Sequence, residues 1–370
     1  MDTYIFITYA MNNNHYCVIM AGGSSSQFWP VSRENMPKEF LALGGPPLLR
    51  TTYDRFAAVV PKENILVVTL ERYKEGAEAI LPELPKENLL LEPYSRQTAP
   101  CMTYAVYTIL KRNPDAVIVA TPSDHVISDE DKFREVVLAA MDHAAREEVL
   151  MTIGIVPESP SADFGYIQVT GGRHLDETRP IKVKTFTEKP SEELAKVFLR
   201  SGEFYWNSGI YIWSAKTVRR ELEKHVPEVT RLFAGWEEHI GTPDEAAFIE
   251  KAYADCPKLS LDYGVLEKTD NAWLYPARFG WSDIGDWDRF FAFGGKNEDG
   301  NLAYAGKALL ENTRGTIVAT AKEGKLIALS GLRDYLVVDT NDVLLICPRD
   351  ARSIKEITSR IAMPEFEKYR

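Results

Sequence analysis

Residues 18–30 read Val-Ile-Met-Ala-Gly-Gly-Ser-Ser-Ser-Gln-Phe-Trp-Pro, and residues 37–41 read Pro-Lys-Glu-Phe-Leu. The apolar run from Tyr16 to Met20 is typical of a short buried strand, and the pair Gly22-Gly23 closely follows it. Glycines after a strand let backbone N–H groups face a chain of phosphates, to which Lys38 can bring a point charge. A plain tight turn is an equal alternative for the glycine pair alone. The stretch lacks the Gly-x-Gly-x-x-Gly of dinucleotide-binding loops, which disfavours a dehydrogenase, and the Gly-Lys-Ser/Thr of P-loops.

Strands and helices alternate downstream of this stretch. Further apolar runs predict strands at 64–70, 116–120 and 150–155, and helical patterns cover 98–110 and 132–148. Such alternation is typical of an α/β domain with a doubly wound, mostly parallel sheet. Ligands of these sheets bind beyond the carboxyl ends of the strands, so polar residues that directly follow a strand are the best site candidates.

The pattern changes near residue 301. Short β-type runs recur at 316–319, 326–329, 335–339 and 343–347, with turn pairs between them, before a last helix at 351–361. Starts about eight to ten residues apart predict a small all-β domain, and both a sandwich and a short β-solenoid fit. We expect three parts: a disordered N-terminal extension (1–15), with Met11 favoured as the true start, an α/β domain (16–295) and a β domain (301–370).

Charge and cysteine content narrow the class of protein. The 370 residues carry 43 Lys and Arg against 54 Asp and Glu, a net charge of −11, which disfavours general nucleic-acid binding. No run of about 18 apolar residues exists, which predicts no membrane span. The cysteines are far apart in the chain, so we expect reduced thiols in a cytoplasmic protein rather than disulfides or a zinc site: Cys17, Cys101, Cys256 and Cys347.

Two aspartates are candidates for a metal site. Asp124 follows the predicted strand 116–120 after Thr-Pro-Ser, and Asp283 lies in the aromatic stretch 281–287. Each has a plain alternative, a helix cap for Asp124 and a turn residue for Asp283. Two separated carboxylates together with triphosphate oxygens are a common way to hold Mg²⁺, which keeps several waters and needs few protein ligands.

Polar residues beside apolar runs are candidates for a sugar site. Glu188 follows the run 183–186, and Asn207 precedes the run 210–213. Glu and Asn suit sugar hydroxyl groups, and Gly165 before Tyr166 allows a close approach of the backbone. Each residue alone is more often structural, and their coexistence favours the functional interpretation.

Taken together, these stretches resemble the mannose-1-phosphate guanylyltransferases (GDP-mannose pyrophosphorylases), in the short form without a fused isomerase domain. The resemblance runs in order from about residue 16 to about residue 350. The matching motifs are Ala21-Gly22-Gly23, Phe28-Trp29-Pro30, Ser32-Arg33, Pro37-Lys38, Phe40-Leu41, Glu92-Pro93, Arg96, Thr98-Ala99-Pro100, Pro122-Ser123-Asp124-His125, Gly165-Tyr166-Ile167, Glu188-Lys189-Pro190, Tyr205-Trp206-Asn207-Ser208-Gly209, Asp262-Tyr263, Glu267-Lys268 and Gly280-Trp281-Ser282-Asp283-Ile284-Gly285.

The resemblance implies a fold, a reaction and residue roles. The first domain would be a nucleotidyltransferase fold related to GT-A glycosyltransferases, and the second a short left-handed parallel β-helix that is often used in dimer contacts, so a homodimer is expected. The reaction would join GTP and α-D-mannose 1-phosphate into GDP-mannose and pyrophosphate, with Mg²⁺. Lys38, Asp124 and Asp283 would be catalytic, and the two aspartates would hold the metal. The implied ligand contacts are Ala21, Gly22, Gly23, Ser24, Gln27, Arg96, Thr98 and Ser123 for the nucleotide, and Gly165, Glu188 and Asn207 for the sugar.

The chain departs from the family pattern at several positions. Ser25 and Gln27 stand for the last Gly and the Arg of Gly-Gly-x-Gly-x-Arg, Gln97 replaces an Asn, and Ala162-Asp163-Phe164 replaces Thr-Gly-Tyr. Gln27 brings neither the charge nor the donor fork of Arg. Two hypotheses follow: a guanylyltransferase, slowed or acting on another hexose 1-phosphate, and an impaired relative that binds nucleotide sugars as a regulatory subunit. The enzyme is favoured because Lys38 and both aspartates remain.

Overall fold

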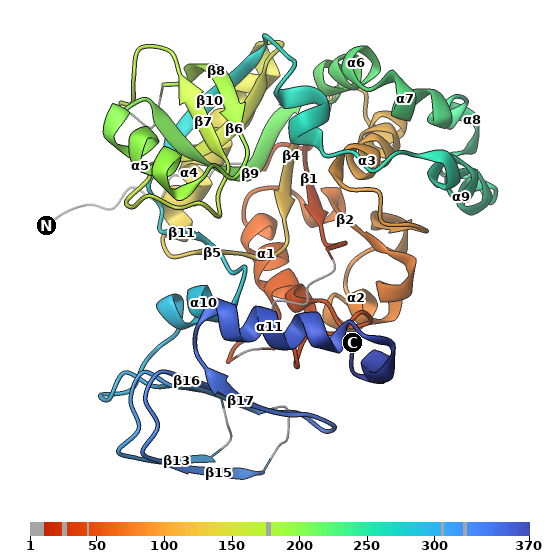
Figure 1. The fold of residues 1–370 in the computed structure, drawn as a ribbon. Coiled ribbons are helices and arrows are strands. Elements are labelled where there is room, and N and C mark those ends of the chain that lie inside the picture. Colours follow the sequence, from red (N-terminus) through yellow and green to blue (C-terminus); the bar gives the residue numbers. More distant parts are fainter. Residues whose placement is uncertain (1–10, 24–27, 43, 175–178, 305–306, 321–323) are drawn as a thin grey trace, which may run out of the picture.

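The computed structural model describes residues 11–23, 28–42, 44–174, 179–304, 307–320 and 324–370. Within them, the main sheet has the strand order β3-β2-β1-β4-β9-β6-β10-β8-β7 (Figure 1). Strands β3, β2, β1 and β4 are parallel neighbours, as are β6 and β10, whereas β9 runs antiparallel to β4 and β6. The strands are β1 His15–Met20, β2 Ile65–Leu70, β3 Leu89–Glu92, β4 Val117–Pro122, β6 Leu150–Ile155, β7 Tyr166–Val169, β8 Ile181–Thr187, β9 Phe204–Ser214 and β10 Ala272–Ala277.

Helices cover both faces of this sheet, which confirms the doubly wound α/β fold. Side chains alternate along β1, so Cys17 and Ile19 pack in one core with α1 and α4, while Tyr16 and Val18 pack in the other with α3 and α6. The helices of this domain are α1 Leu48–Ala57, α2 Lys74–Ile80, α3 Thr98–Arg112, α4 Glu130–Arg146, α5 Glu192–Ser201, α6 Ala215–His225, α7 Pro227–Thr230, α8 Trp236–His239 and α9 Glu245–Asp255.

An N-cap residue explains why one helix begins earlier than its hydrophobic pattern predicts. Helix α4 begins two residues before the predicted Lys132 because the Asp129 side chain accepts a hydrogen bond from the backbone N–H of Lys132 at 3.0 Å. At the start of the chain, residues 11–14 form a turn rather than a disordered segment. Asn64 donates to the carbonyls of Asn13 and His15 at 2.9 and 3.0 Å and holds this turn to the sheet. The disorder expected for residues 1–10 lies outside the described residues.

The C-terminal strands form a coil, which confirms the β-helix and excludes the sandwich. β12 (Leu302–Tyr304), β14 (Ile317–Thr320) and β16 (Tyr335–Asp339) are parallel neighbours, and β13 (Lys307–Glu311) pairs in parallel with β15 (Leu326–Ser330). Since each strand pairs with the next but one, successive turns stack. β17 (Leu344–Pro348) closes the stack antiparallel to β16.

The two domains share one apolar core. Helices α10 (Trp287–Phe293) and α11 (Ala351–Ile361) lie between the main sheet and the β-helix in Figure 1. Phe28 and Trp287 are buried in one cluster with Ile317, Leu336 and other residues of the β-helix. A 3₁₀-helix at Pro364–Tyr369 follows α11, and the carbonyl of Tyr369 accepts a hydrogen bond from the indole of Trp29. No described helix meets the length and hydropathy that a membrane crossing requires.

Candidate active site

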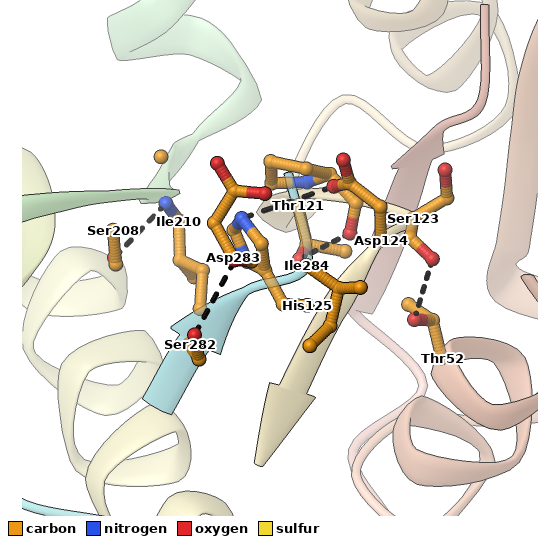
Figure 2. Close-up of polar contacts among 12 residues, drawn as sticks. Thr52, Thr121, Ser123, Asp124, His125, Ser208, Ile210, Ser282, Asp283 and Ile284 are labelled. Carbon is orange, nitrogen blue, oxygen red and sulfur yellow. Dashed lines mark hydrogen bonds and ion pairs between the residues drawn. The ribbon is translucent and has the colours of Figure 1, made fainter. Parts of the chain in front are cut away.

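A short antiparallel ladder brings the two predicted aspartates together. β5 (His125–Ile127) pairs with β11 (Trp281–Asp283), so that Asp283 lies opposite His125, directly beside Asp124. Asp124 itself follows the carboxyl end of β4. Figure 2 shows both carboxylates pointing into a common space. Residues that are far apart in the sequence therefore converge, as predicted, at the edge where ligands of parallel sheets bind.

Lys38 lies between these carboxylates. Its ammonium nitrogen is 2.7 Å from Asp124 Oδ2 and 3.7 Å from Asp283 Oδ1, and it donates to the carbonyl of Ile284 at 3.1 Å. Burial alone would lower the pKa of Lys38, but the two carboxylates outweigh it and raise this pKa. Burial would likewise raise the pKa of Asp124, yet Lys38 keeps it below its ordinary value. Lys38 and Asp124 therefore each favour the charged form of the other.

One carboxylate oxygen of the aspartate pair is left without a hydrogen bond. Asp283 Oδ1 is buried and has no hydrogen-bond partner. An unsatisfied carboxylate oxygen is costly unless a ligand completes it. The described residues contain no group of three or more His, Cys, Asp or Glu arranged to hold a metal. The donor set is therefore two carboxylates, which fits Mg²⁺ completed by phosphate and water oxygens.

Gly22 and Gly23 contact two buried glutamates, Glu92 and Glu39, to which the sequence analysis assigned no role. A Cβ on Gly22 would approach Glu92 Oε2 to 3.2 Å, so the loop backbone sits tightly on this side chain. Burial raises the pKa of Glu92 to about 8. Burial also raises the pKa of Glu39 to about 7, although the backbone N–H of Gly23 stabilises its carboxylate. Ala21 is fixed at the end of β1 by its N–H, which donates to the carbonyl of Val68 at 2.8 Å.

The other predicted nucleotide contacts divide into two groups. The backbone N–H of Ser123 donates to the carbonyl of Met20 at 3.1 Å, so Ser123 lies beside Ala21, and its contact with a nucleotide stays a prediction. Arg96 instead donates to the carbonyls of Tyr253 and Ala254 at 3.1 and 2.9 Å, and Thr98 accepts from the N–H of Leu261. Those two side chains tie the β3–α3 loop to its neighbours, so their contact with a nucleotide stays a prediction. Ser24, Ser25 and Gln27 lie outside the described residues.

The three predicted sugar contacts converge. A Cβ on Gly165 would meet Glu188 Oε2 at 2.7 Å and Asn207 Cβ at 3.3 Å. The backbone N–H of Asn207 donates to the carbonyl of Gly165 at 2.8 Å. Burial, and then the negative charges of Asp262 and Glu267, raise the pKa of Glu188. Only a glycine at 165 leaves this space open.

Asp262 orients the amide of Asn207, a contact that sequence reasoning missed. Asp262 Oδ1 accepts from Asn207 Nδ2 at 2.8 Å and also from the hydroxyl of Tyr211. The Asp262-Tyr263 pair was part of the family resemblance, but its sequence distance from Asn207 concealed the contact. Arg289, which reaches Asp283, was missed because it reads as a solvated residue on a helix.

Comparison with known proteins agrees with this geometry. Residues 16–299 match the family model described as Nucleotidyl transferase, and residues 306–361 match one described as MannoseP isomerase/GMP-like beta-helix domain. The mannose-1-phosphate guanylyltransferase of Escherichia coli (strain K12) is 36% identical over 358 residues, which cover 94% of this chain and 73% of that protein. The ManC protein of Salmonella typhimurium, also named a mannose-1-phosphate guanylyltransferase, is 35% identical over 358 residues, which again cover 94% of this chain and 73% of that protein.

A solved structure is also similar over almost the whole chain. The crystal structure of a Thermus thermophilus protein, described as a mannose-1-phosphate geranyltransferase, is 30% identical. It covers 95% of this chain and 100% of its own, with a TM-score of 0.80. The similarity therefore extends over both domains and the join between them.

Proposed function

The chain belongs to the mannose-1-phosphate guanylyltransferase family, and we propose that it transfers GMP from GTP to α-D-mannose 1-phosphate, giving GDP-mannose and pyrophosphate. The observation that carries this proposal is the convergence of Lys38, Asp124 and Asp283 on one point. The glycine loop adjoins this point, and the trio Gly165, Glu188 and Asn207 provides a site for the sugar.

The reaction needs charge neutralisation more than a reactive side chain. A phosphate oxygen of the hexose 1-phosphate attacks the α-phosphorus of GTP in line, and pyrophosphate leaves. Two unit charges about 4 Å apart interact by roughly 4 kcal/mol at an effective dielectric constant of about 20, so unscreened anions would resist this approach. Lys38 supplies a fixed positive charge for this neutralisation. Mg²⁺, when held by Asp124 and Asp283, would add Lewis-acid neutralisation of the phosphates.

Gly165, Glu188 and Asn207 would orient the hexose 1-phosphate. Glu188 and Asn207 offer an acceptor and an amide to hydroxyl groups, and Gly165 lets the ring lie against the backbone. Binding energy of this kind holds the attacking phosphate in line with the α-phosphorus, and positioning is a large part of catalysis in such transfers. Mannose is proposed from the family, and another hexose 1-phosphate is the alternative substrate.

We also propose Mg²⁺ dependence, a homodimer and a cytoplasmic location. The dimer is supported by apolar side chains that the β-helix turns to solvent, Leu309 and Leu326, which are 51% and 56% exposed. The location is supported by free, buried thiols at all four cysteines.

One assay separates the enzyme from an impaired, nucleotide-binding relative. The protein is incubated with Mg²⁺, each common NTP and each of several hexose 1-phosphates, and pyrophosphate release is followed. We expect the fastest release with GTP and mannose 1-phosphate. Release from no pair, with GTP binding retained, would instead support the regulatory relative. Release that is fastest with another hexose 1-phosphate would correct the substrate but keep the reaction.

A further inference from the structure

Arg289 joins the candidate metal carboxylate to the edge of the sugar site. It lies in the first turn of α10, whose N-cap Asp286 accepts from its backbone N–H at 2.9 Å. Its Nη1 is 3.3 Å from Asp283 Oδ2, and its Nη2 is 2.8 Å from Asp163 Oδ2. The side chain is 18% exposed, whereas that of Asp163 is 69% exposed. The guanidinium is therefore mostly buried, and its ion-pair partner Asp163 lies at the surface.

Packing fixes the plane of this guanidinium. Its carbon lies 4.6 Å from the ring centre of Phe164, which in turn packs on Trp206 and Trp281 at 4.9 and 5.0 Å. A Cβ on Gly285 would come within 2.8 Å of Arg289 Nη1, so the backbone at Gly285 also lies close to the guanidinium. A planar cation held between an aromatic ring and a backbone keeps its donors in one direction.

The two oxygens of Asp283 therefore have different roles. Arg289 occupies Oδ2, while Oδ1 is buried, has no hydrogen-bond partner and faces Lys38 at 3.7 Å. A carboxylate that ligates a metal through one oxygen is commonly oriented by a donor to the other. Asp163 and Phe164, which hold Arg289, are two of the positions where the chain departs from its family pattern. The arrangement is therefore built from this chain's own residues.

We propose that Arg289, anchored by Asp163 and Phe164, is a positioning residue that fixes Asp283 so that Oδ1 faces a divalent cation bound with the nucleotide. This inference rests on the proposed function, because it assumes that Asp283 holds the metal of a metal–nucleotide complex. In this proposal Arg289 contacts neither the attacking phosphate oxygen nor the α-phosphorus of GTP. It acts only through the Asp283 carboxylate that it orients.

If only charge mattered, removal of Arg289 would change the metal affinity in the direction opposite to that expected from orientation, so the two effects can be told apart by experiment. Arg289 is a cation close to a cation site, so its removal would strengthen metal binding if only charge mattered. If orientation matters, both Arg289→Ala and Arg289→Lys weaken metal binding, since Lys keeps the charge but loses the planar fork. We expect a loss of roughly ten- to hundredfold for Ala, within the range found for outer partners of metal ligands.

The measurement is Mn²⁺ binding in the presence of GTP, read from the free Mn²⁺ signal in electron paramagnetic resonance. Wild type is compared with Arg289→Ala, Arg289→Lys and, as a matched control, Arg352→Ala, whose side chain is 89% exposed on α11 and pairs with Glu356 at i,i+4. Weaker binding in both Arg289 variants, with the control unchanged, supports the proposal. Unchanged or tighter binding in either variant, or no Mn²⁺ binding by wild type, overturns it.

A parallel activity assay separates this inference from the proposed function. The Mg²⁺ concentration for half-maximal pyrophosphate release should rise in both Arg289 variants, while the KM for mannose 1-phosphate changes little. If wild type binds Mn²⁺ with GTP but releases no pyrophosphate, the proposed function fails while the binding comparison still decides the role of Arg289. Far-ultraviolet circular dichroism and Tm show whether the variants remain folded.

Discussion

Lys38 lies between Asp124 and Asp283, and the family resemblance raises the question of which cation replaces the arginine that Gln27 lacks. The family places an arginine at position 27, and another arginine nearby could replace it. Arg33 is not free for this role, because it donates to the carbonyls of Pro30 and Tyr369 and pairs with Asp342 at 2.9 Å. We therefore propose that Lys38 carries more of the charge neutralisation than it would beside an arginine at position 27.

The first prediction concerns the loop that precedes Lys38. The double variant Ser25→Gly/Gln27→Arg should gain about tenfold in turnover, or roughly 1.4 kcal/mol of barrier, since it restores a charged donor fork and glycine torsions. The two changes should act non-additively because they lie in one loop. Steady-state kinetics of wild type, both single variants and the double variant measure this. A wild type that Gln27→Arg does not improve would show that the charge is already supplied elsewhere.

The second prediction concerns Glu92, whose side chain is buried beneath Gly22 and accepts a hydrogen bond from the Tyr253 hydroxyl at 3.0 Å. Its pKa rises from an ordinary 4.5 to about 8. Between these values the unfolded chain releases a proton that the folded chain keeps, so the contribution of Glu92 to stability falls as pH rises through this window. Glu92→Gln has no such proton and should lose less stability from about pH 5 to about pH 9, by an amount on the order of a few kcal/mol.

Denaturant unfolding at several pH values measures this difference. Glu39, whose pKa is raised to about 7, titrates in both proteins and cancels in the comparison. If the free energy of unfolding of wild type and Glu92→Gln changed with pH in the same way, the pKa of Glu92 would not be raised in the folded protein.

At the level of elements, the turn after α9 contacts the residues of the proposed sugar site. Residues Asp262–Leu266 form a π-helix, a rare turn that often occurs at functional sites. It directs Asp262 toward Asn207 and the Tyr211 hydroxyl. The carboxylate thereby fixes which way the amide of Asn207 points.

The third prediction follows from this contact. Asp262→Asn should raise the KM for mannose 1-phosphate about tenfold with little change in the KM for GTP, because a misdirected amide weakens binding of the sugar alone. It should also lower the pKa of Glu188, which Asp262 raises now, and shift the acid limb of the pH profile toward lower pH. Tyr211→Phe, which keeps the carboxylate, serves as the milder comparison. Equal increases in both KM values would point to a general structural role for Asp262.

Local patterns predicted several of the elements but not their long-range pairing. The strand at Leu150–Ile155 and the helix at Ala351–Ile361 begin and end where periodicity places them. The antiparallel insertion of β9 and the ladder between β5 and β11 could not be read locally, since nothing in the sequence of Trp281–Asp283 specifies His125–Ile127 as its partner. The convergence of Asp124 and Asp283 was thus available only through family resemblance.

At the scale of the whole molecule, the β-helix completes the core of the catalytic domain. Trp287, fully buried, packs with Phe28 on one side and with β-helix residues on the other. The sequence pattern predicted two domains, but it could not show that an apolar cluster joins them, because each apolar run is consistent with a core of its own. Removal of residues 301–370 would uncover this cluster, so such a deletion cannot test assembly.

The fourth prediction therefore uses surface variants. Leu309→Asp/Leu326→Asp should convert a dimer into a monomer without loss of Tm, since both side chains are more than half exposed in the single chain. Multi-angle light scattering gives the mass. Val197→Asp on α5, at a side chain 57% exposed, is the control and should leave the mass unchanged. A monomeric wild type, or a dimer that survives both charges, would exclude this surface as the interface.

We propose that Asp124, Asp283 and Lys38 form one centre for guanylyl transfer. The most direct measurement is ³¹P nuclear magnetic resonance of GTP and mannose 1-phosphate with Mg²⁺, comparing wild type with Asp124→Asn and Asp283→Asn. The account predicts pyrophosphate and the diphosphate signals of GDP-mannose with wild type, and at least about a hundredfold slower formation with each variant at unchanged circular dichroism. GDP-mannose formed at the wild-type rate by either variant would contradict the account.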